Sequence, residues 1–304
     1  MKVLVTGACG FIGYSVCREF HELGYSVIGW DLNERESKWQ LCKIDLYNQN
    51  MVKNKLKEIS PDIIIHCAGA ADVGKSVKNP YFDYNSNVTV THDLLFLLHE
   101  LEMHNTRFVF LSSAGVYGNP INLPITEDMD VNPMSPYALH KVMCEDVCRY
   151  FSDNYEMDIK IIRIFSAYGE GLRKQIFWDM HKKVEETGRL SMFGTGNESR
   201  DYINIIDLIR AIYIVATKAP KTELIYNVAN GEEITIREAT ECFANASGIN
   251  LEMISFTGEK KEGNPINWKA DISKLKMLGY KKTVEFGEGI ARYILWVRRN
   301  DQSL

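Results

Sequence analysis

The chain has 304 residues, of which 45% are hydrophobic and 25% charged, and its formal net charge is −5. These values are typical of a globular protein with a full buried core. The absence of a long basic run argues against nucleic acid as a partner. No apolar stretch reaches the ~20 residues that a membrane span needs. Because the start "MKVLVTG" reads as a strand and not as a signal peptide, we expect no membrane attachment and a cytoplasmic location.

The cysteines and histidines argue against a metal centre. The seven cysteines are an odd number and form no CxxC pair, and they lie mostly among apolar residues. The seven histidines show neither HxxxH nor HExxH spacing. We therefore expect reduced, buried cysteines and no metal site.

The first two-thirds of the chain alternates short apolar runs with helical patterns. The runs at 2–6, 26–30, 62–66, 107–111 and 159–164 predict strands, and the segments at about 11–23, 48–58, 83–104 and 135–156 predict helices. Near-continuous apolar strands separated by amphipathic helices indicate a parallel sheet that helices cover on both faces. Ligands of such sheets bind beyond the carboxyl ends of the strands.

The pattern loosens after about residue 165. Helices are predicted near 174–186, from about 207, and at 236–247, 272–278 and 286–299, with one strand at 225–230. We predict an α/β fold: a Rossmann-type doubly wound parallel sheet with a smaller mixed α/β C-terminal lobe. The first domain covers 1–165, the lobe covers 166–304, and residues from about 201 to 217 return to the first domain.

A glycine-rich turn follows the first strand in "VLVTGACGFIGYSVCREF". Gly7 permits a tight turn, Gly10 lets the backbone approach a pyrophosphate, and Gly13 lets the helix pack on the strand. The helix that begins at Phe11 and Ile12 offers free N–H groups and the positive end of its dipole to phosphate. The spacing GxxGxxG predicts a dinucleotide site, with a plain tight turn as the alternative.

Asp31 ends the second predicted strand. A carboxylate at this place can bind both ribose hydroxyls of NAD and repel the 2′-phosphate of NADP. The alternatives are a solvated turn aspartate, or NADP accommodated through the nearby Arg35. We expect NAD rather than NADP. In "IDLYN" (44–48), Asp45 and Leu46 are placed to flank the adenine, unless they only mark the start of a helix.

A helix start at "SPYALHK" (135–141) places a phenol and an ammonium four residues apart. Ser135 can cap this helix and Pro136 suits its first position. At spacing i,i+4, Tyr137 and Lys141 share one face, which alone is most often a packed aromatic ring beside a snorkelling lysine. The alternative is chemical, because an ammonium stabilises a phenolate that acts as a base.

Several ordered motifs together carry a family resemblance. With "GACGFIG", "IIIHCAGAADVGKS", "FLSSAGVYG", "YALHK", "RIFSAYGEG" and "FGTGNESRDYINIIDL", the chain resembles the extended short-chain dehydrogenase/reductase superfamily. The likeness is to its nucleotide-sugar epimerase/dehydratase family, of the UDP-glucose 4-epimerase type, and runs nearly end to end. It implies that residues 1–165 bind NAD and that the C-terminal lobe binds a nucleotide sugar.

The resemblance assigns roles to single positions. Tyr137 becomes the acid/base of a YxxxK pair with Lys141, and both residues also contact the cofactor. Ser113 becomes the catalytic serine that also binds the substrate hydroxyl. Ala68 and Gly69 fall where the chain passes the cofactor, and Arg200 falls where relatives bind the diphosphate. His140 is expected on the helix surface and not as a second base.

The chain also departs from the family pattern. Sugar 4,6-dehydratases resemble "TDEVYG" where this chain has "SAGVYG", so Ala114 and Gly115 replace the acidic pair that moves protons during water elimination. Dehydration is therefore disfavoured. Ser166 stands where relatives commonly carry asparagine, and is expected at the substrate. Asn267 and Lys269 lie where many relatives carry arginine.

Two helices are expected to form a subunit interface. By resemblance, 83–104 and 135–156 pair across a two-fold axis in a homodimer. "DLLFLLHEL" (93–101) is apolar on more than one face, which suits a helix buried on two sides. A deep core helix is the competing interpretation.

The leading functional hypothesis is an NAD-dependent nucleotide-sugar epimerase that acts at C4 through a transient 4-keto intermediate. The alternative is a nucleotide 4-keto-sugar reductase or a C4 dehydrogenase, which share Tyr137, Lys141 and Ser113 but change the cofactor in proportion to the sugar converted. A non-catalytic dinucleotide sensor would need the glycine turn without these three residues together.

Overall fold

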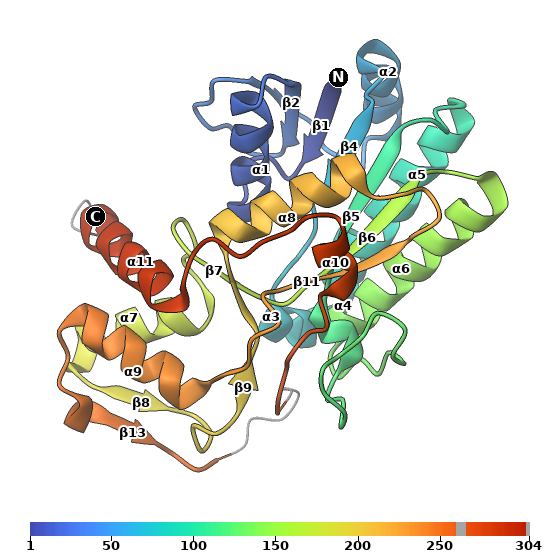
Figure 1. The fold of residues 1–304 in the computed structure, drawn as a ribbon. Helices are drawn as coiled ribbons and strands as arrows, with labels where there is room; N and C mark the ends of the chain where they lie inside the picture. Colours follow the sequence, from blue (N-terminus) through green and yellow to red (C-terminus); the bar gives the residue numbers. More distant parts are fainter. Residues whose placement is uncertain (260–265, 302–304) are drawn as a thin grey trace.

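The computed structural model describes residues 1–259 and 266–301. Its centre is a seven-stranded sheet in the order β11-β6-β5-β4-β1-β2-β3, and every pair of neighbours is parallel (Figure 1). The strands are β1 (Lys2–Thr6), β2 (Ser26–Asp31), β3 (Gln40–Lys43), β4 (Ile63–His66), β5 (Arg107–Ser113), β6 (Ile159–Ile164) and β11 (Ile225–Val228). The predicted doubly wound parallel sheet is confirmed.

The strands are buried on both faces, which explains their continuous apolar runs. All residues of β4 and β6 are buried, and side chains that alternate along β1 enter two different cores. Val3 and Val5 pack with α1 (Phe11–Glu22) and α8 (Ile205–Lys218). Leu4 packs on the other face with α2 (Gln49–Ile59), α5 (Val90–Glu100) and α6 (Pro136–Tyr155).

The segment predicted as one helix at 83–104 is broken. It consists of α4 (Pro80–Tyr84), a π-helical turn (Asn85–Thr89) and α5, and it ends at Glu100. In the π-helical turn the Asn87 side chain donates to the main-chain oxygens of Asp83, at 2.9 Å, and Ala70, at 3.2 Å. A short helix that the sequence reasoning missed, α3 (Val73–Lys78), precedes α4.

The C-terminal lobe has its own apolar core and is built of helices and short strand pairs. Its core includes Phe177, Met180, Phe243 and Tyr293. The lobe contains α7 (Gln175–Thr187), α9 (Ile236–Ser247), α11 (Phe286–Asp301), the pair β8 (Leu190–Met192) and β13 (Ile254–Phe256), the pair β9 (Ser199–Arg200) and β12 (Ile234–Thr235), and the 3-10 turn Leu251–Met253. These elements form the lower left part of Figure 1.

The chain crosses between the two parts more than once. A two-stranded pair of β7 (Ser166–Tyr168) and β10 (Tyr202–Asn204) leads into α8, which packs against α1. The next strand, β11, then joins the edge of the central sheet beside β6. Helix α8 and strand β11 therefore both contact elements of the first domain. Helix α10 (Ser273–Met277) packs against β11.

The expectation of buried cysteines holds for three of the seven, and the other four are half-buried. All seven cysteines are free, and Cys17, Cys144 and Cys148 are buried. Among residues 1–259 and 266–301, no three His, Cys, Asp or Glu side chains are grouped so that they could hold a metal ion. No helix in the described part of the chain is long and apolar enough to cross a membrane.

Candidate active site

The glycine turn between β1 and α1 is packed so tightly that side chains are excluded. Gly7 has φ +67°, and a Cβ on it would lie 2.8 Å from the Ala68 nitrogen. A Cβ on Gly13 would lie 2.1 Å from the Gly7 oxygen, whereas one on Gly10 would meet only that oxygen, at 3.2 Å. Gly7 and Gly13 thus bring the strand and helix together, and Gly10 leaves room for a ligand.

The first turn of α1 is suited to a phosphate. Gly10 is the N-cap, and no side chain caps the helix; no acidic residue lies in the first turn. The N–H groups at Phe11, Ile12 and Gly13 therefore meet no side-chain acceptor and stand at the positive end of the helix dipole. These features fit the pyrophosphate of a dinucleotide.

Asp31 lies at the end of β2, beside the glycine turn. Its carboxylate accepts the Cys9 N–H at 2.9 Å and the Asn33 N–H at 2.9 Å. Arg35 stacks on the Tyr14 ring, 3.4 Å from its centroid, and reaches the Cys9 oxygen at 3.5 Å. A carboxylate fixed to the turn in this way fits the ribose end of NAD.

The adenine-flanking candidates lie next to Asp31. The Ile44 N–H donates to the Asp31 oxygen at 2.9 Å, and Asp45 and Leu46 follow directly. Asp45 is exposed, and its side chain accepts the Tyr47 N–H at 3.0 Å. Leu46 is half-buried and packs against the apolar core that also contains Leu4. Asp45 and Leu46 therefore lie, like Asp31, at the carboxyl ends of the strands.

The turn after β4 completes the cofactor side of the site. The Ala68 N–H donates to Thr6 Oγ1 at 3.2 Å, and Thr6 Oγ1 also bonds His66 Nδ1 at 2.7 Å. Gly69 has φ +139°, and a Cβ there would lie 2.6 Å from Asn87 Oδ1. Sequence reasoning missed Thr6, His66 and Asn87, although "IIIHCAGAADVGKS" contains one of them.

The N-terminal turn of α6 carries the phenol and the ammonium. Ser135 caps the helix by accepting the Ala138 N–H at 3.2 Å, and the Tyr137 N–H donates to Ser76 Oγ at 3.1 Å. The buried Lys141 Nζ donates to the Leu111 oxygen at 2.9 Å, and it lies 5.8 Å from the Tyr137 ring centroid. Tyr137 and Lys141 thus share one face, directed to the end of β5.

The Lys141 charge acts on the groups at the ends of the neighbouring strands. Burial, and then the charge of Lys141, lower the pKa of His66 to about 3, so this imidazole is neutral. Burial raises the pKa of the Cys67 thiol to about 12, against the opposing effect of Lys141. At the ends of β4 and β5 the Lys141 ammonium therefore faces a neutral imidazole and a neutral thiol.

Ser113 lies at the carboxyl end of β5, beside α6. Its Oγ accepts the Gly115 N–H at 3.1 Å, which starts a 3-10 turn at Ala114–Tyr117. A Cβ on Gly115 would lie 3.6 Å from the Ala138 Cβ, so this turn contacts the residue next to Tyr137. Since Oγ accepts that bond, its O–H is left to donate.

The substrate-side candidates come from the C-terminal lobe. The Ser166 N–H donates to the Asp201 oxygen at 3.0 Å, so Ser166 lies beside the strand that carries Arg200. Arg200 donates to the Ile266 oxygen at 3.1 Å and lies 5.6 Å from the Trp268 ring centroid. Asn267 Oδ1 accepts from Ser199. Asn267, which stands where many relatives carry arginine, therefore lies beside the strand of Arg200.

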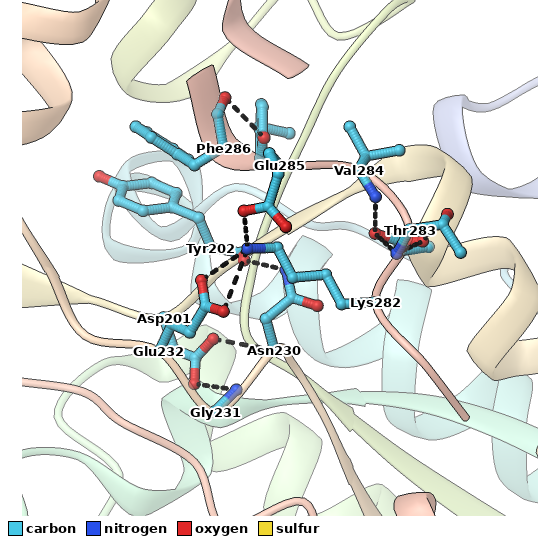
Figure 2. A network of polar contacts seen from close by, with 12 residues as sticks. Asp201, Tyr202, Asn230, Gly231, Glu232, Lys282, Thr283, Val284, Glu285 and Phe286 are labelled. Carbon is cyan, nitrogen blue, oxygen red and sulfur yellow. Dashed lines mark hydrogen bonds and ion pairs between the residues drawn. The ribbon is translucent and has the colours of Figure 1, made fainter. Parts of the chain in front are cut away.

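Asp201 anchors the strand of Arg200 to the rest of the lobe. Its carboxylate accepts N–H groups from Asn230, Gly231 and Ala270, each at 3.0 Å. Figure 2 shows the Asp201–Asn230–Gly231 part of this network, together with Lys282, which pairs with Glu232 and Glu285. The position of Arg200 is therefore set by buried hydrogen bonds.

A cavity of about 460 Å³ opens next to the turn that follows β4. Its lining runs from Ala70 and Ala71 to α3 and α4, and includes Ser76 and Asp83. From the other part of the molecule, Lys174 lines it too and donates to the Ala71 oxygen at 3.1 Å. Because Ser76 also holds the Tyr137 N–H, the cavity adjoins the N-terminal turn of α6.

The expectation for His140 is wrong. His140 is only 7% exposed, and its Nδ1 lies 2.6 Å from Asp83 Oδ2. The sequence pattern did not reveal that α4 packs on this side of α6. His140 is thus a buried partner of α4 and not a surface residue.

Comparison with known proteins decides the family. Residues 3–229 match the NAD dependent epimerase/dehydratase family. The chain belongs to this family. The UDP-glucose 4-epimerase of Mycolicibacterium smegmatis is 30% identical over 99% of this chain and 100% of that protein. The family membership confirms the predicted class of NAD-dependent nucleotide-sugar enzyme and its cofactor, and the glycine turn and Asp31 fit NAD as described above.

Two solved structures of the family share the fold. The UDP-glucuronic acid 4-epimerase of Bacillus cereus, in complex with UDP-glucuronic acid and NAD, has a TM-score of 0.89 and 26% identity over 98% of this chain and 99% of that chain. The dTDP-glucose 4,6-dehydratase of Streptomyces venezuelae, with NAD bound, has a TM-score of 0.89 and 25% sequence identity, over 100% of this chain and 98% of that chain. The fold is therefore common to epimerases and dehydratases.

Proposed function

We propose that this protein is an NAD-dependent nucleotide-sugar epimerase that inverts C4 through a transient 4-keto sugar. The observation that supports the proposal is the position of Lys141: its Nζ bonds the Leu111 oxygen on β5, the strand that ends at Ser113, and lies 5.8 Å from the Tyr137 ring centroid. In this proposal residues 1–165 hold the cofactor, with the chain returning at 201–217, and the lobe of residues 166–304 holds the nucleotide sugar.

The cofactor is held by the residues that the fold gathers around the glycine turn. Gly7, Gly10 and Gly13 and the N–H groups of Phe11 and Ile12 would hold the pyrophosphate. Asp31 would bind the adenosine ribose, Asp45 and Leu46 would flank the adenine, and Ala68 and Gly69 would lie where the chain passes the cofactor. Bound NAD supplies a nicotinamide ring that takes up a hydride and gives it back.

The chain's own residues move the proton. Tyr137 takes the proton of the sugar 4-hydroxyl as C4 is oxidised, and returns it after the keto sugar has presented its other face. Ser113 donates its O–H to the same sugar oxygen. Lys141 uses one of three N–H donors on Leu111, which leaves two for Tyr137 and the nicotinamide ribose. Its positive charge stabilises the phenolate.

Dehydration is disfavoured because the groups it needs are missing. Elimination of water requires a proton to be taken from carbon and another to be given to the leaving hydroxyl. At the two positions after Ser113, Ala114 is fully buried and Gly115 has no side chain. Neither can transfer a proton, which separates this chain from a dehydratase of the same fold.

A nucleotide diphosphate is the group that the C-terminal lobe is suited to bind. Arg200 provides the guanidinium fork that matches a diphosphate, and Ser166 adds a short hydroxyl next to it. We infer that UDP-sugars are the substrates, because the two epimerases among the similar proteins are a UDP-glucose 4-epimerase and a UDP-glucuronic acid 4-epimerase with UDP-glucuronic acid bound.

The test is a stoichiometric assay. The protein is incubated with UDP-glucose, UDP-N-acetylglucosamine and UDP-glucuronate in turn, and the isomers and the nicotinamide absorbance are followed together. We expect one 4-epimer to appear without a net change in absorbance. An absorbance change in proportion to product would establish a reductase or a dehydrogenase instead.

A Tyr137→Phe variant tests the catalytic assignment. It keeps the ring but lacks the proton-transferring oxygen, so turnover should fall roughly 100-fold or more with the fold retained. Full turnover of this variant would refute the assignment. Tyr155→Phe, on the same helix but at its far end, should leave turnover unchanged.

We also propose that the protein is a homodimer through the helices predicted at 83–104 and 135–156. Phe96 on α5 and Leu139, Met143 and Tyr150 on α6 are large apolar side chains that are 38% to 55% exposed. The three on α6 recur at helical spacing, so they share one face. In sedimentation experiments the wild-type protein should be a dimer and the Met143→Glu variant a monomer. The control variant Leu295→Glu, on α11, should remain a dimer.

We also propose a cytoplasmic location, because the cysteines form no disulfide in the described part of the chain. All seven cysteines are free, including half-buried Cys9 at the glycine turn. Reduced thiols near a cofactor site are compatible with a reducing compartment. Fractionation of cells that produce the protein would test this directly.

A further inference from the structure

The N-terminal turn of α6 is held by two side chains from α3 and α4. Ser76 Oγ of α3 accepts the N–H of Tyr137 at 3.1 Å. Asp83 Oδ2 of α4 bonds Nδ1 of His140 at 2.6 Å. Both bonds fall on one turn of the helix, the turn that carries the proposed catalytic tyrosine. The rotation of α6 about its axis is therefore fixed from this side by polar contacts.

The Asp83–His140 contact is buried. Asp83 is 1% exposed and His140 is 7% exposed. The Tyr84 ring lies edge-on to the imidazole, with the ring centroids 5.5 Å apart. A buried carboxylate that loses its partner pays the full cost of its desolvation, so the two side chains hold each other in one geometry.

Asp83 keeps a polar atom that the fold does not use. Its second oxygen, Oδ1, is buried and has no hydrogen-bond partner in the described part of the chain. Asp83 also lines the cavity of about 460 Å³ that adjoins the turn after β4. The pair thus connects the wall of that cavity to the turn of Tyr137.

We propose that Asp83 and His140 form a positioning pair for Tyr137. The pair fixes the rotation of α6 so that the Tyr137 hydroxyl points at the substrate, and it acts on the reaction through the position of Tyr137. This proposal rests on the proposed epimerase function. It requires that loss of the pair lowers kcat by a larger factor than it changes NAD affinity or the KM for the UDP-sugar, because the glycine turn, Asp31 and Arg200 lie outside α6.

Four variants test the pair. His140→Leu removes the donor, Asp83→Leu removes the acceptor, and the double variant removes both. His140→Asn is the matched control, because its amide N–H can stand where Nδ1 stands and still reach Asp83. We expect each leucine variant to lower kcat about tenfold or more, since small misplacements of a catalytic group cost at least that much. His140→Asn should stay within about threefold of the wild type.

The double variant separates positioning from stability. Replacing both partners by apolar groups leaves no unpaired buried charge, so its melting temperature should recover above those of the single variants. Under our proposal its kcat stays low. Recovery of kcat together with stability, or a full kcat in His140→Leu, would overturn the positioning role while leaving the epimerase function intact. A wild type that converts no UDP-sugar in the same assay would refute both.

Discussion

The ammonium of Lys141 donates to the main-chain oxygen of Leu111 at 2.9 Å, and so ties α6 to the end of β5. This one bond places the cation between the two segments that carry Tyr137 and Ser113. It also explains why a lysine can be buried here, because the charge has a fixed acceptor and an aromatic face, Phe110, at 4.7 Å. The proposed mechanism requires this charge at this place.

Lys141→Met should therefore remove catalysis and leave the fold. Methionine fills the same space but has neither charge nor donor, so kcat should fall roughly 100-fold or more. The measurement is turnover of the UDP-sugar with saturating NAD, with circular dichroism as the check on folding. Lys55→Met, on the surface of α2, is the matched control. Turnover of Lys141→Met at the wild-type rate would contradict the role given to the charge.

The glycine turn offers a graded test. In Gly13→Ala the new Cβ would lie 2.1 Å from the Gly7 oxygen, whereas in Gly10→Ala it would lie 3.2 Å from the same atom. We expect Gly13→Ala to lower the free energy of unfolding by about 2–3 kcal/mol. Gly10→Ala should fold well and lose NAD affinity instead. Urea denaturation and NAD titration measure the two effects, and equal destabilisation by both would contradict this account.

Asp31 should decide the choice between the two dinucleotides. Asp31→Ser removes the carboxylate that receives the ribose hydroxyls, which should weaken NAD binding roughly 10- to 100-fold. NADP binding should become stronger, because the repulsive charge is gone and Arg35 lies near the turn. Binding of both cofactors is measured by titration. Glu34→Gln, next to Arg35 and exposed, is the control, and an unchanged preference in Asp31→Ser would refute the assignment.

The sequence predicted the parts of this site that depend on local pattern. The runs "KVLVT" and "IKIIRI" are apolar because they are buried on both faces, and these two predicted strands match β1 and β6 at both ends. Ser135 caps α6 as expected, because a cap needs only the residues beside it. For the same reason the glycine turn could be interpreted from its own residues and spacing.

The parts that failed depend on contacts between distant segments. His140 appeared to be a surface residue because nothing in "YALHK" shows that Asp83 lies opposite it. The helix at 83–104 breaks at a π-helical turn because the Asn87 side chain bonds Asp83 and Ala70. That β11 joins the central sheet beside β6 is likewise a non-local pairing, which periodicity cannot reveal.

Arg200 provides a test of the substrate side. Arg200→Met should raise the KM for the UDP-sugar about tenfold or more, because a charged hydrogen bond to the diphosphate is lost. The NAD affinity should not change, since Asp31 and the glycine turn lie in the other part of the chain. Arg237→Met is the control, because Arg237 lies on α9 and stacks on Phe256. A rise in KM with both variants would contradict the role of Arg200.

Asp201, next to Arg200, should give the stability a distinctive pH dependence. Burial raises the pKa of Asp201 to about 7, against the effect of its three N–H donors. An unfolded aspartate has a pKa of about 3.9. Between these two values the folded protein holds one more proton than the unfolded chain. The free energy of unfolding that comes from Asp201 therefore falls as the pH rises from about 4 to about 7, and is constant above that.

Asp201→Asn lacks the titrating group, so the stability difference between wild type and variant should grow as the pH falls from about 8 to about 5. Urea denaturation at several pH values in that range measures it. Asp271→Asn is the control: hydrogen bonds from Ser273 lower the pKa of Asp271, so its own contribution is lost only below about pH 4. A difference that is independent of pH in Asp201→Asn would show that its N–H donors keep Asp201 ionised throughout.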